Sequence, residues 1–302
     1  MPSLKEIKGR IGSVKSTLKI TSAMKLVASA KLRKAQQTIE GMRPYEMKLQ
    51  EILARVMEQA GAASFSGAYA RTEPQNASEE GMTAAKQKIA MVAFASNSSL
   101  CGAFNANVVR LALETLRSYE NADVTVYSVG RKMAESMKKV GKPSPADYQK
   151  LADKPAYASA AELAESLMEA YREGRLDRVD LVYNHFVSSG KQVPVRETLL
   201  PMGEIPGGVI PSEAKESDIE YILEPSAAEL LEDLIPKSLR LKFYTALLDS
   251  NASEHAARTV AMQTATDNGE DLLQELTLQY NKGRQQKITS EILDLAGGSQ
   301  EQ

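Results

Sequence analysis

The sequence has very few of the side chains that build most catalytic and metal sites. Among its 302 residues there are one cysteine, two histidines and no tryptophan, and aromatic residues make up 5%. His185 and His255 lie far apart, and Cys101 alone can form neither an intramolecular disulfide nor a cysteine cluster. We therefore expect no metal, no cofactor and no catalytic site, and we expect each histidine to serve packing or contact.

Two segments resemble parts of ligand sites but lack the necessary context. Residues 9–16 are Gly-Arg-Ile-Gly-Ser-Val-Lys-Ser, whereas a phosphate-binding loop needs glycine directly before lysine and a strand in front. Residues 100–104 follow an expected strand, where α/β proteins often bind ligands, but a tight turn explains their glycine. A Cys101 nucleophile would need a base, for which His185 is the candidate. An enzyme that uses the α/β segment therefore stays as an alternative.

The sequence also lacks a long apolar run. No stretch is apolar enough to span a bilayer, and the first residues lack the apolar part of a signal peptide. These absences predict a soluble, cytoplasmic protein. The net charge of −2 gives no overall preference for nucleic acid or membrane.

Charge is nevertheless segregated along the chain. Residues 7–39 carry eight basic side chains and no acidic one, whereas residues 212–234 carry eight acidic side chains and one lysine. The basic stretch contains no aromatic side chain and matches no nucleic-acid-binding module. A solvated face and a contact with an acidic protein surface remain the two interpretations of it.

Both ends of the chain have the pattern of long helices. In residues 3–59 apolar side chains recur at intervals of three and four, beginning Leu4, Ile7, Ile11. At the other end, Ser226 to Glu229 forms a capping-box pattern, a seven-residue repeat follows, and Gly297-Gly298 ends it. The repeat consists of Leu241, Leu248, His255 and Met262, with Leu276 two heptads later.

Helices of this length do not fit inside a compact body. They would span about 84 Å and about 105 Å, against a radius of gyration of about 19 Å for a globule of this size. Each needs a partner for its apolar stripe, and the other helix is the nearest available one. The alternative is a bundle of shorter helices with turns at Gly41, Pro44 and Pro236, since proline should kink or interrupt a helix.

The middle of the chain has the pattern of an α/β domain. An apolar run at 89–95 is typical of a buried strand, and further strands are expected at 123–129, 179–188 and 192–200. Helices are expected at 107–119, at 132–140 and from a second capping box at Ser159 to Gly174. This order predicts a mostly parallel sheet covered by helices, with a hairpin at its edge.

The predicted fold class is therefore α/β, with a long antiparallel coiled coil of the terminal helices and a small Rossmann-like α/β domain between them. The expected limits are 1–60 for the first helix, 61–85 for a connecting segment, 86–210 for the α/β domain and 211–302 for the second helix.

Three stretches resemble the gamma subunits of F-type rotary ATP synthases. They are residues 4–33, residues 100–105 (Leu-Cys-Gly-Ala-Phe-Asn), and residues 253–292, which include Ser-Glu-His-Ala-Ala-Arg and Leu-Gln-Tyr-Asn-Lys-Gly-Arg-Gln. The resemblance follows the whole chain in order. The family usually has Asp-Arg-Gly where this chain has Asn97-Ser98-Ser99, and alanine is common at the position of Gly283.

The resemblance implies a non-catalytic rotor shaft. Such a shaft stands inside a ring of three alpha and three beta subunits, and it binds the epsilon subunit and the membrane c-ring. It couples transmembrane ion flow to ATP synthesis or hydrolysis. The implied location is peripheral, on the cytoplasmic face of the bacterial inner membrane, and no nucleic acid is implied. A non-rotary coiled-coil tether is the competing hypothesis.

By the family's motifs, six residues are expected to contact the alpha and beta subunits. Met24 should lie near the acidic lever region of beta, and the others divide between a contact with beta loops and an apolar bearing. Those expected at the beta loops are Arg258, Gln285 and Thr289, and those expected in the bearing are Ile292 and Leu295.

Overall fold

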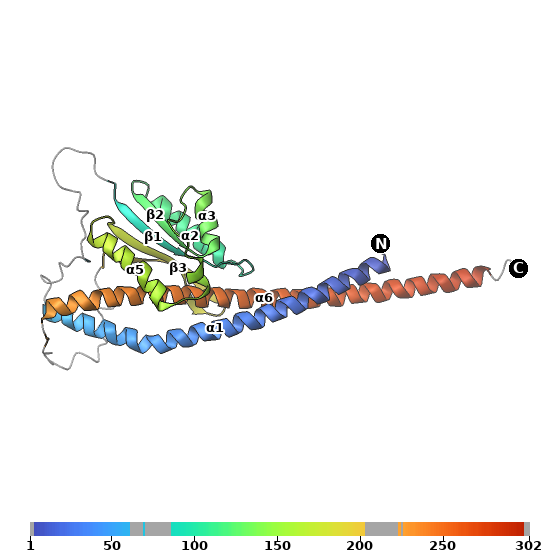
Figure 1. Ribbon diagram of the computed structural model, residues 1–302. Helices are drawn as coiled ribbons and strands as arrows, with labels where there is room; N and C mark the ends of the chain where they lie inside the picture. The colour runs from blue at the N-terminus through green and yellow to red at the C-terminus, as the bar shows by residue number, and fades with distance from the viewer. Residues whose placement is uncertain (1–2, 61–68, 70–85, 203–222, 225, 299–302) are drawn as a thin grey trace. The chain divides into compact units, whose positions relative to one another are not determined.

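The computed structural model describes residues 3–60, 69, 86–202, 223–224 and 226–298 (Figure 1). Most of the expected 61–85 segment, and residues 211–222 of the expected second helical region, lie outside the described residues. The elements within them are α1 (Leu4–Ala60), β1 (Lys88–Phe94), α2 (Phe104–Ser118), β2 (Asp123–Val129), α3 (Arg131–Lys139), α4 (Gln149–Asp153), α5 (Tyr157–Arg172), β3 (Arg178–Ser188), β4 (Lys191–Leu200) and α6 (Ala227–Gly298).

The chain divides into two compact units. Unit 1 comprises Met1–Ala30 and Arg258–Gln302, and unit 2 comprises Lys31–Ala257. Each unit thus contains a part of both long helices, and each is described by itself. The domain limits expected from the sequence assign each long helix to one domain, whereas the two units each take a part of both helices. Those expected limits stay predictions.

The two expected long helices are confirmed as continuous, and proline interrupts neither of them. α1 contains Pro44 and α6 contains Pro236 without a break. An interior proline costs a helix about 3 kcal/mol. Around Pro236 the packing of Leu231, Ile235 and Leu239 in the core of unit 2 offsets that cost. The bundle of shorter helices is therefore not formed.

Of the two predicted capping boxes, the one at Ser226 forms its N-cap hydrogen bond. The backbone N–H of Glu229 donates to Ser226 Oγ at 3.3 Å, one residue before α6 begins. Ser159, in contrast, does not cap α5. This helix begins two residues earlier, at Tyr157, after Ala156 in extended conformation and without a side-chain cap.

The sheet has the order β2-β1-β3-β4. β1 pairs in parallel with β2 and with β3, and β4 closes the edge as an antiparallel hairpin with β3. Six of the seven residues of β1 are buried, as a central parallel strand requires. The predicted mostly parallel sheet with an edge hairpin is confirmed, and α4 is the one described helix that the sequence pattern did not predict.

Helices cover both faces of the sheet. On one face, Val108 of α2 and Met133 and Met137 of α3 pack against β1 and β2. On the other face, α5 and the unit 2 parts of α1 and α6 build a larger core (Figure 1). At its centre Phe94 meets Phe243 edge to face, with ring centroids 5.7 Å apart. Burying one such ring contributes about 2 to 3 kcal/mol.

A glycine at the end of β2 is required by the path of the chain. Gly130 has φ +100°, and a Cβ there would lie 2.1 Å from the carbonyl oxygen of Ala95. The backbone that follows β1 therefore passes directly against the start of α3.

Candidate functional site

In unit 1 the two helices pair antiparallel. Leu4 of α1 lies against Gly283 of α6, and Leu18 lies against Gly269. The hydroxyl of Thr266 donates to that of Thr21 at 3.0 Å. Positions later in α1 thus contact positions earlier in α6. Further along, Lys25 Nζ donates to Gln263 Oε1. The predicted antiparallel pair is confirmed in this unit.

Large side chains of α1 fit over glycines of α6. A Cβ added to Gly269 would lie 2.7 Å from Leu18 Cδ2, and one added to Gly283 would lie 3.1 Å from Leu4 Cδ2. Both glycines continue the seven-residue repeat through Met262 and Leu276, which are 3% and 6% exposed. Gly269, which fills the gap in the heptad repeat between Met262 and Leu276, is therefore a packing position. At position 283, the contact with Leu4 explains why a residue without a side chain is found there.

α6 continues beyond the first residue of α1. Gly283 lies opposite Leu4, and α6 runs on to Gly298 (Figure 1). About 15 residues, or roughly 22 Å of helix, thus extend past the start of α1. Ile288, Ile292 and Leu293 in this part are 45%, 59% and 64% exposed. An apolar helix end of this kind needs a partner that covers it.

Three predicted contact residues share one face of this helix end. Gln285, Thr289 and Ile292 follow the spacing i, i+4, i+7 and are all exposed. The hydroxyl of Thr289 donates to the backbone carbonyl oxygen of Gln285 at 2.9 Å. This bond does not involve the side-chain amide of Gln285. Leu278, which is 70% exposed, lies one heptad before Gln285. We call these four residues the outer stripe.

The other predicted contact residues occupy different surroundings. Met24 is partly buried on the paired part of α1. Arg258 is only 8% exposed within this chain. Leu295 belongs to α6, but its side chain lies outside the described residues. The structure thus groups Gln285, Thr289 and Ile292, and the contact roles of all six stay predictions.

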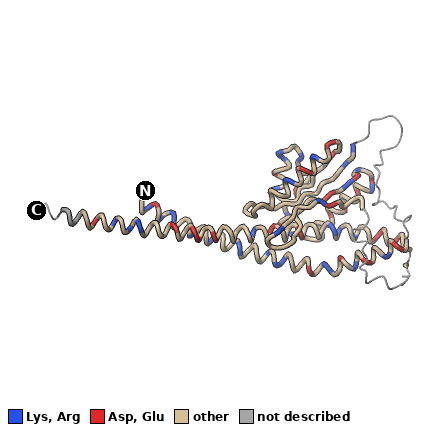
Figure 2. The backbone as a smooth tube through the Cα atoms, turned by 180° about the vertical axis from the view of Figure 1, so that it is seen from behind, with Lys and Arg blue, Asp and Glu red and all other residues tan. Residues whose placement is uncertain are grey.

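Opposite charges accompany the pairing of the helices. In unit 1, α1 carries basic residues that include Lys15 and Lys19, and α6 carries Asp267, Glu270, Asp271 and Glu275 in the segment that runs beside these two lysines. Figure 2 shows the two signs interspersed along these paired segments. The basic stretch therefore has an acidic neighbour within its own chain, in addition to its exposed side.

The loop after β1 is a hydrogen-bonded turn. Asn105 Nδ2 donates to Cys101 Sγ at 3.1 Å and to Ser96 Oγ at 2.8 Å. His185 contacts Asp249 of α6, so the structure pairs Cys101 and His185 with different groups. Buried Cys101 thus belongs to the turn that connects β1 with α2.

Asn97, part of the departure from the family's usual sequence, has a structural role. Its Oδ1 accepts the N–H of Arg131 at 2.8 Å, at the start of α3, and its Nδ2 donates to the carbonyl oxygen of Gln149 at 2.8 Å. A single amide side chain therefore links the loop after β1 to α3 and α4. An aspartate here could accept but could not donate.

A buried carboxylate that the sequence analysis missed lies on β3. Asp180 is fully buried and accepts from Arg178 Nε at 2.9 Å, from Arg196 Nε at 3.0 Å, from Thr198 Oγ1 at 3.1 Å and from Tyr119. Burial and the neighbouring carboxylate raise the pKa of Tyr119 to about 12. The sequence signal was an acidic residue between the apolar side chains of Val179 and Leu181 in an expected strand, because a buried carboxylate requires paired donors.

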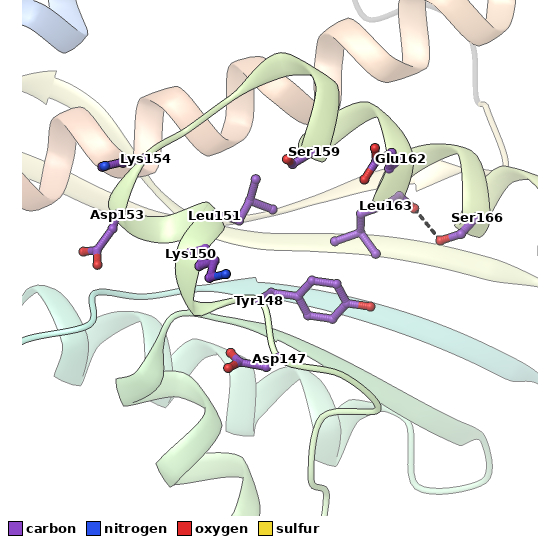
Figure 3. A pocket seen from close by; sticks show the side chains of 10 residues that line it. All are labelled: Asp147, Tyr148, Lys150, Leu151, Asp153, Lys154, Ser159, Glu162, Leu163 and Ser166. Carbon is purple, nitrogen blue, oxygen red and sulfur yellow. Dashed lines mark hydrogen bonds between the residues drawn. The ribbon is translucent and has the colours of Figure 1, made fainter.

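A surface hollow of about 660 Å³ lies between α4 and α5. Leu151 and Leu163 extend into it, and charged side chains of both signs, including Asp153 and Lys154, surround it (Figure 3). None of the six predicted contact residues lines it. Because its charges are mixed, the hollow favours no class of ligand.

Among the described residues, no helix has both the length and the apolar character that crossing a bilayer requires. Within the same residues, no three histidine, cysteine or acidic side chains gather in a way that could hold a metal ion.

Comparison with known proteins assigns the family. The family model described as ATP synthase matches residues 3–300. An ATP synthase gamma chain of Bacteroides fragilis is 52% identical over 309 residues, and one of Phocaeicola vulgatus is 50% identical over 306, each with 99% of both chains covered. The chain belongs to the ATP synthase gamma-chain family. The family resemblance inferred from the terminal motifs is confirmed.

Two solved structures from ATP synthases share this fold. The rotor of the Euglena gracilis mitochondrial ATP synthase matches with a TM-score of 0.59 at 21% identity, over 94% of this chain and 98% of that one. The central stalk of the Tetrahymena thermophila enzyme matches with a TM-score of 0.53 at 24% identity, over 82% and 99%. Long terminal helices around a small α/β domain are thus the fold that this gamma-chain family member has in common with these structures.

Proposed function

We propose that this chain is the central rotor shaft of an F-type ATP synthase. Its partners in this role are three alpha and three beta subunits, the epsilon subunit and the membrane c-ring. The shaft couples ion flow through the ring to ATP synthesis or hydrolysis at the alpha and beta subunits. The complex places it at the cytoplasmic face of the inner membrane, as a peripheral subunit.

The observation that carries this proposal is the exposed end of α6. Ile288, Ile292 and Leu293 are apolar, exposed and beyond the reach of α1. An apolar sleeve formed by a ring of subunits would cover them on all sides. We assign Ile292, with Leu295 one turn on, to this bearing.

Rotation requires contacts that differ from one angle to the next. A pair of helices has no threefold symmetry, so each of three beta subunits arranged around it meets a different face. A shaft that contacts one beta conformation better than another shifts the population toward that conformation. Gln285 and Thr289 on the outer stripe, with Met24 and Arg258, are the proposed contacts with beta. The chain itself contributes no catalytic group in this proposal.

Reconstitution with purified alpha and beta subunits tests the proposal. We expect one copy of this chain in a complex with three alpha and three beta subunits, and an ATPase activity that depends on it. If no complex forms and the activity is unchanged, the coiled-coil tether is the better hypothesis.

The bearing has its own test in the same assay. Ile292→Asp places a charge in the proposed sleeve and should lower the chain-dependent ATPase activity severalfold. Asn281→Asp is the matched control, because it adds the same charge at an exposed polar position of α6 that lies before the end extending past α1. Equal effects of the two variants would contradict an apolar bearing at Ile292.

A further inference from the structure

In unit 2, two side chains one turn apart on α6 hold three consecutive residues near the end of β3. The three residues are Asn184, His185 and Phe186. Asp249 Oδ1 accepts the backbone N–H of Phe186 at 2.8 Å, and Asp249 Oδ2 lies 2.5 Å from Nδ1 of His185. Ser253, one turn later, donates its hydroxyl to the carbonyl oxygen of Asn184 at 2.9 Å. The strand end is therefore fixed to the helix by side chains of the helix.

The same contact brings an apolar side chain against both long helices. Phe186 packs on a small cluster formed by Leu32 and Ala35 of α1 and by Ala252 and Ala256 of α6. The position of the Phe186 ring depends on its backbone, which Asp249 holds. A change at the His185–Asp249 pair thus affects how the sheet is held on the two helices.

The two members of the pair differ in exposure. The side chain of His185 is 53% exposed, so solvent protons reach it, whereas that of Asp249 is 15% exposed. Burial raises the pKa of Asp249, and the contacts with His185 and the Phe186 N–H oppose that rise. The contacts with His185 and with the Phe186 N–H therefore both stabilise the ionised carboxylate against the effect of burial.

The other groups around the pair provide little spare positive charge. Glu197 of β4 adds to the negative field at Asp249 and is itself paired with Lys242 of α6 at 2.9 Å. Tyr183 of β3 donates to Glu197 at 3.1 Å. Further groups on these elements include Glu46 and Arg43 of α1, which interact with each other, and the buried Glu254 and His255 of α6.

We propose that His185 and Asp249 form a proton-operated latch between β3 and α6, which holds the sheet most firmly on the helices when the imidazole is protonated. Nδ1–H donates to Asp249 in both charge states, and the proton enters and leaves at Nε2. Loss of that proton removes the ionic part of the contact and leaves the hydrogen bond. Histidine is the residue type that proteins most often use as a proton switch, and the exposed imidazole edge of His185 gives solvent access to this one.

Amide hydrogen exchange of the full-length chain tests the latch directly. Between pH 6 and 8.5, with the intrinsic exchange rate corrected for, the protection of the Phe186 amide should fall severalfold, because the ionic part of the contact that holds its acceptor is lost. The amide of Val92 in β1 is the internal reference and should not change. A flat profile at Phe186 overturns the proposal.

Two variants at position 185 separate the charge from the contact. His185→Lys keeps a cation at every pH tested, so the protection of Phe186 should stay high and flat. His185→Gln keeps a donor without charge, so it should be low and flat. A pH dependence that persists in His185→Lys would assign it to another group, such as Glu46 or His255, and overturn the latch.

The consequence for coupling rests on the proposed rotor function and has a separate readout. In the complex with alpha and beta subunits, the pH profile of ATPase activity should be flatter with His185→Lys than with the unmodified chain. Identical ATPase profiles, with the exchange result as expected, would overturn the link to coupling and leave the latch. Failure of the chain to activate ATPase at any pH would instead count against the rotor function.

Discussion

Adding one methyl group at Gly269 should reveal how closely the two helices of unit 1 approach. A Gly→Ala change inside an exposed helix stabilises it by about 1 kcal/mol, because alanine has the better helix propensity. At Gly269, however, the new Cβ would lie 2.7 Å from Leu18 Cδ2 and 3.3 Å from Leu18 Cγ. Such a contact forces the leucine to move, and overpacking of this kind costs typically about 1 to 3 kcal/mol.

The net effect at Gly269 is therefore a loss of about 0 to 2 kcal/mol in the local free energy of opening. Gly9→Ala is the matched control, since nothing lies within 4 Å of a Cβ at that position. It should show the full gain of about 1 kcal/mol. Amide exchange within residues 262–276 and 8–18 measures both changes, because it reports the opening of unit 1 separately from the unfolding of unit 2.

A double-mutant cycle makes the interpretation specific. Leu18→Ala removes the side chain that the new methyl group meets, so Gly269→Ala in that background should be stabilising, as at Gly9. If Gly269→Ala stabilises the unmodified chain as much as Gly9→Ala does, then Leu18 does not pack over Gly269, and the close pairing described for unit 1 is wrong.

Three further predictions concern unit 2. Asp180→Asn should lower the free energy of unfolding by about 3 kcal/mol in a urea titration, because it leaves two arginines without their shared carboxylate; Asp123→Asn, at an exposed position of β2, is the control for a change of charge alone. Phe243→Ala should cost about 3 to 5 kcal/mol by the same measurement, since the ring is fully buried against Phe94, and a cost below 1 kcal/mol would contradict that packing. Stability should fall as the pH rises from 10 to 12, because the pKa of Tyr119 is raised from 10.0 to about 12 and the unfolded chain loses this proton first; Tyr119→Phe should remove that part of the decline, as followed by tyrosinate absorbance and circular dichroism.

Much of the fold could be predicted from patterns that depend on neighbours in sequence. The 3–4 spacing of Leu4, Ile7 and Ile11 and the apolar run of β1 each carry their own periodicity, so the long helix and the buried strand were predicted correctly. The error at Ser159 came from the same source, since a capping-box pattern does not reveal that Tyr157 already packs edge to face against Tyr244 of α6.

What could not be predicted depends on pairs of residues from distant elements. Nothing local connects His185 with Asp249, or Asp180 with Arg196, because the sheet register and the position of α6 decide these contacts. At Pro236, proline disfavours a helix locally, but the packing of the surrounding leucines and isoleucine outweighs this preference. The outer stripe was found only in part: the family motifs named Gln285, Thr289 and Ile292, while Leu278 is recognised from its exposure and its heptad position.

The antiparallel pairing of unit 1 also determines when it can form during biosynthesis. Thr21 and Thr266, which share a hydrogen bond, are separated by 245 positions in the chain. A ribosome releases the first residues of α1 long before it makes the segment of α6 that covers them, so the sheet and its helices can fold first. Contacts this distant in sequence form slowly, because a long loop must be closed before any of them is made. The helix pair is accordingly the last part of the nascent chain to assemble, and until then the apolar stripe of α1 stays exposed to chaperones.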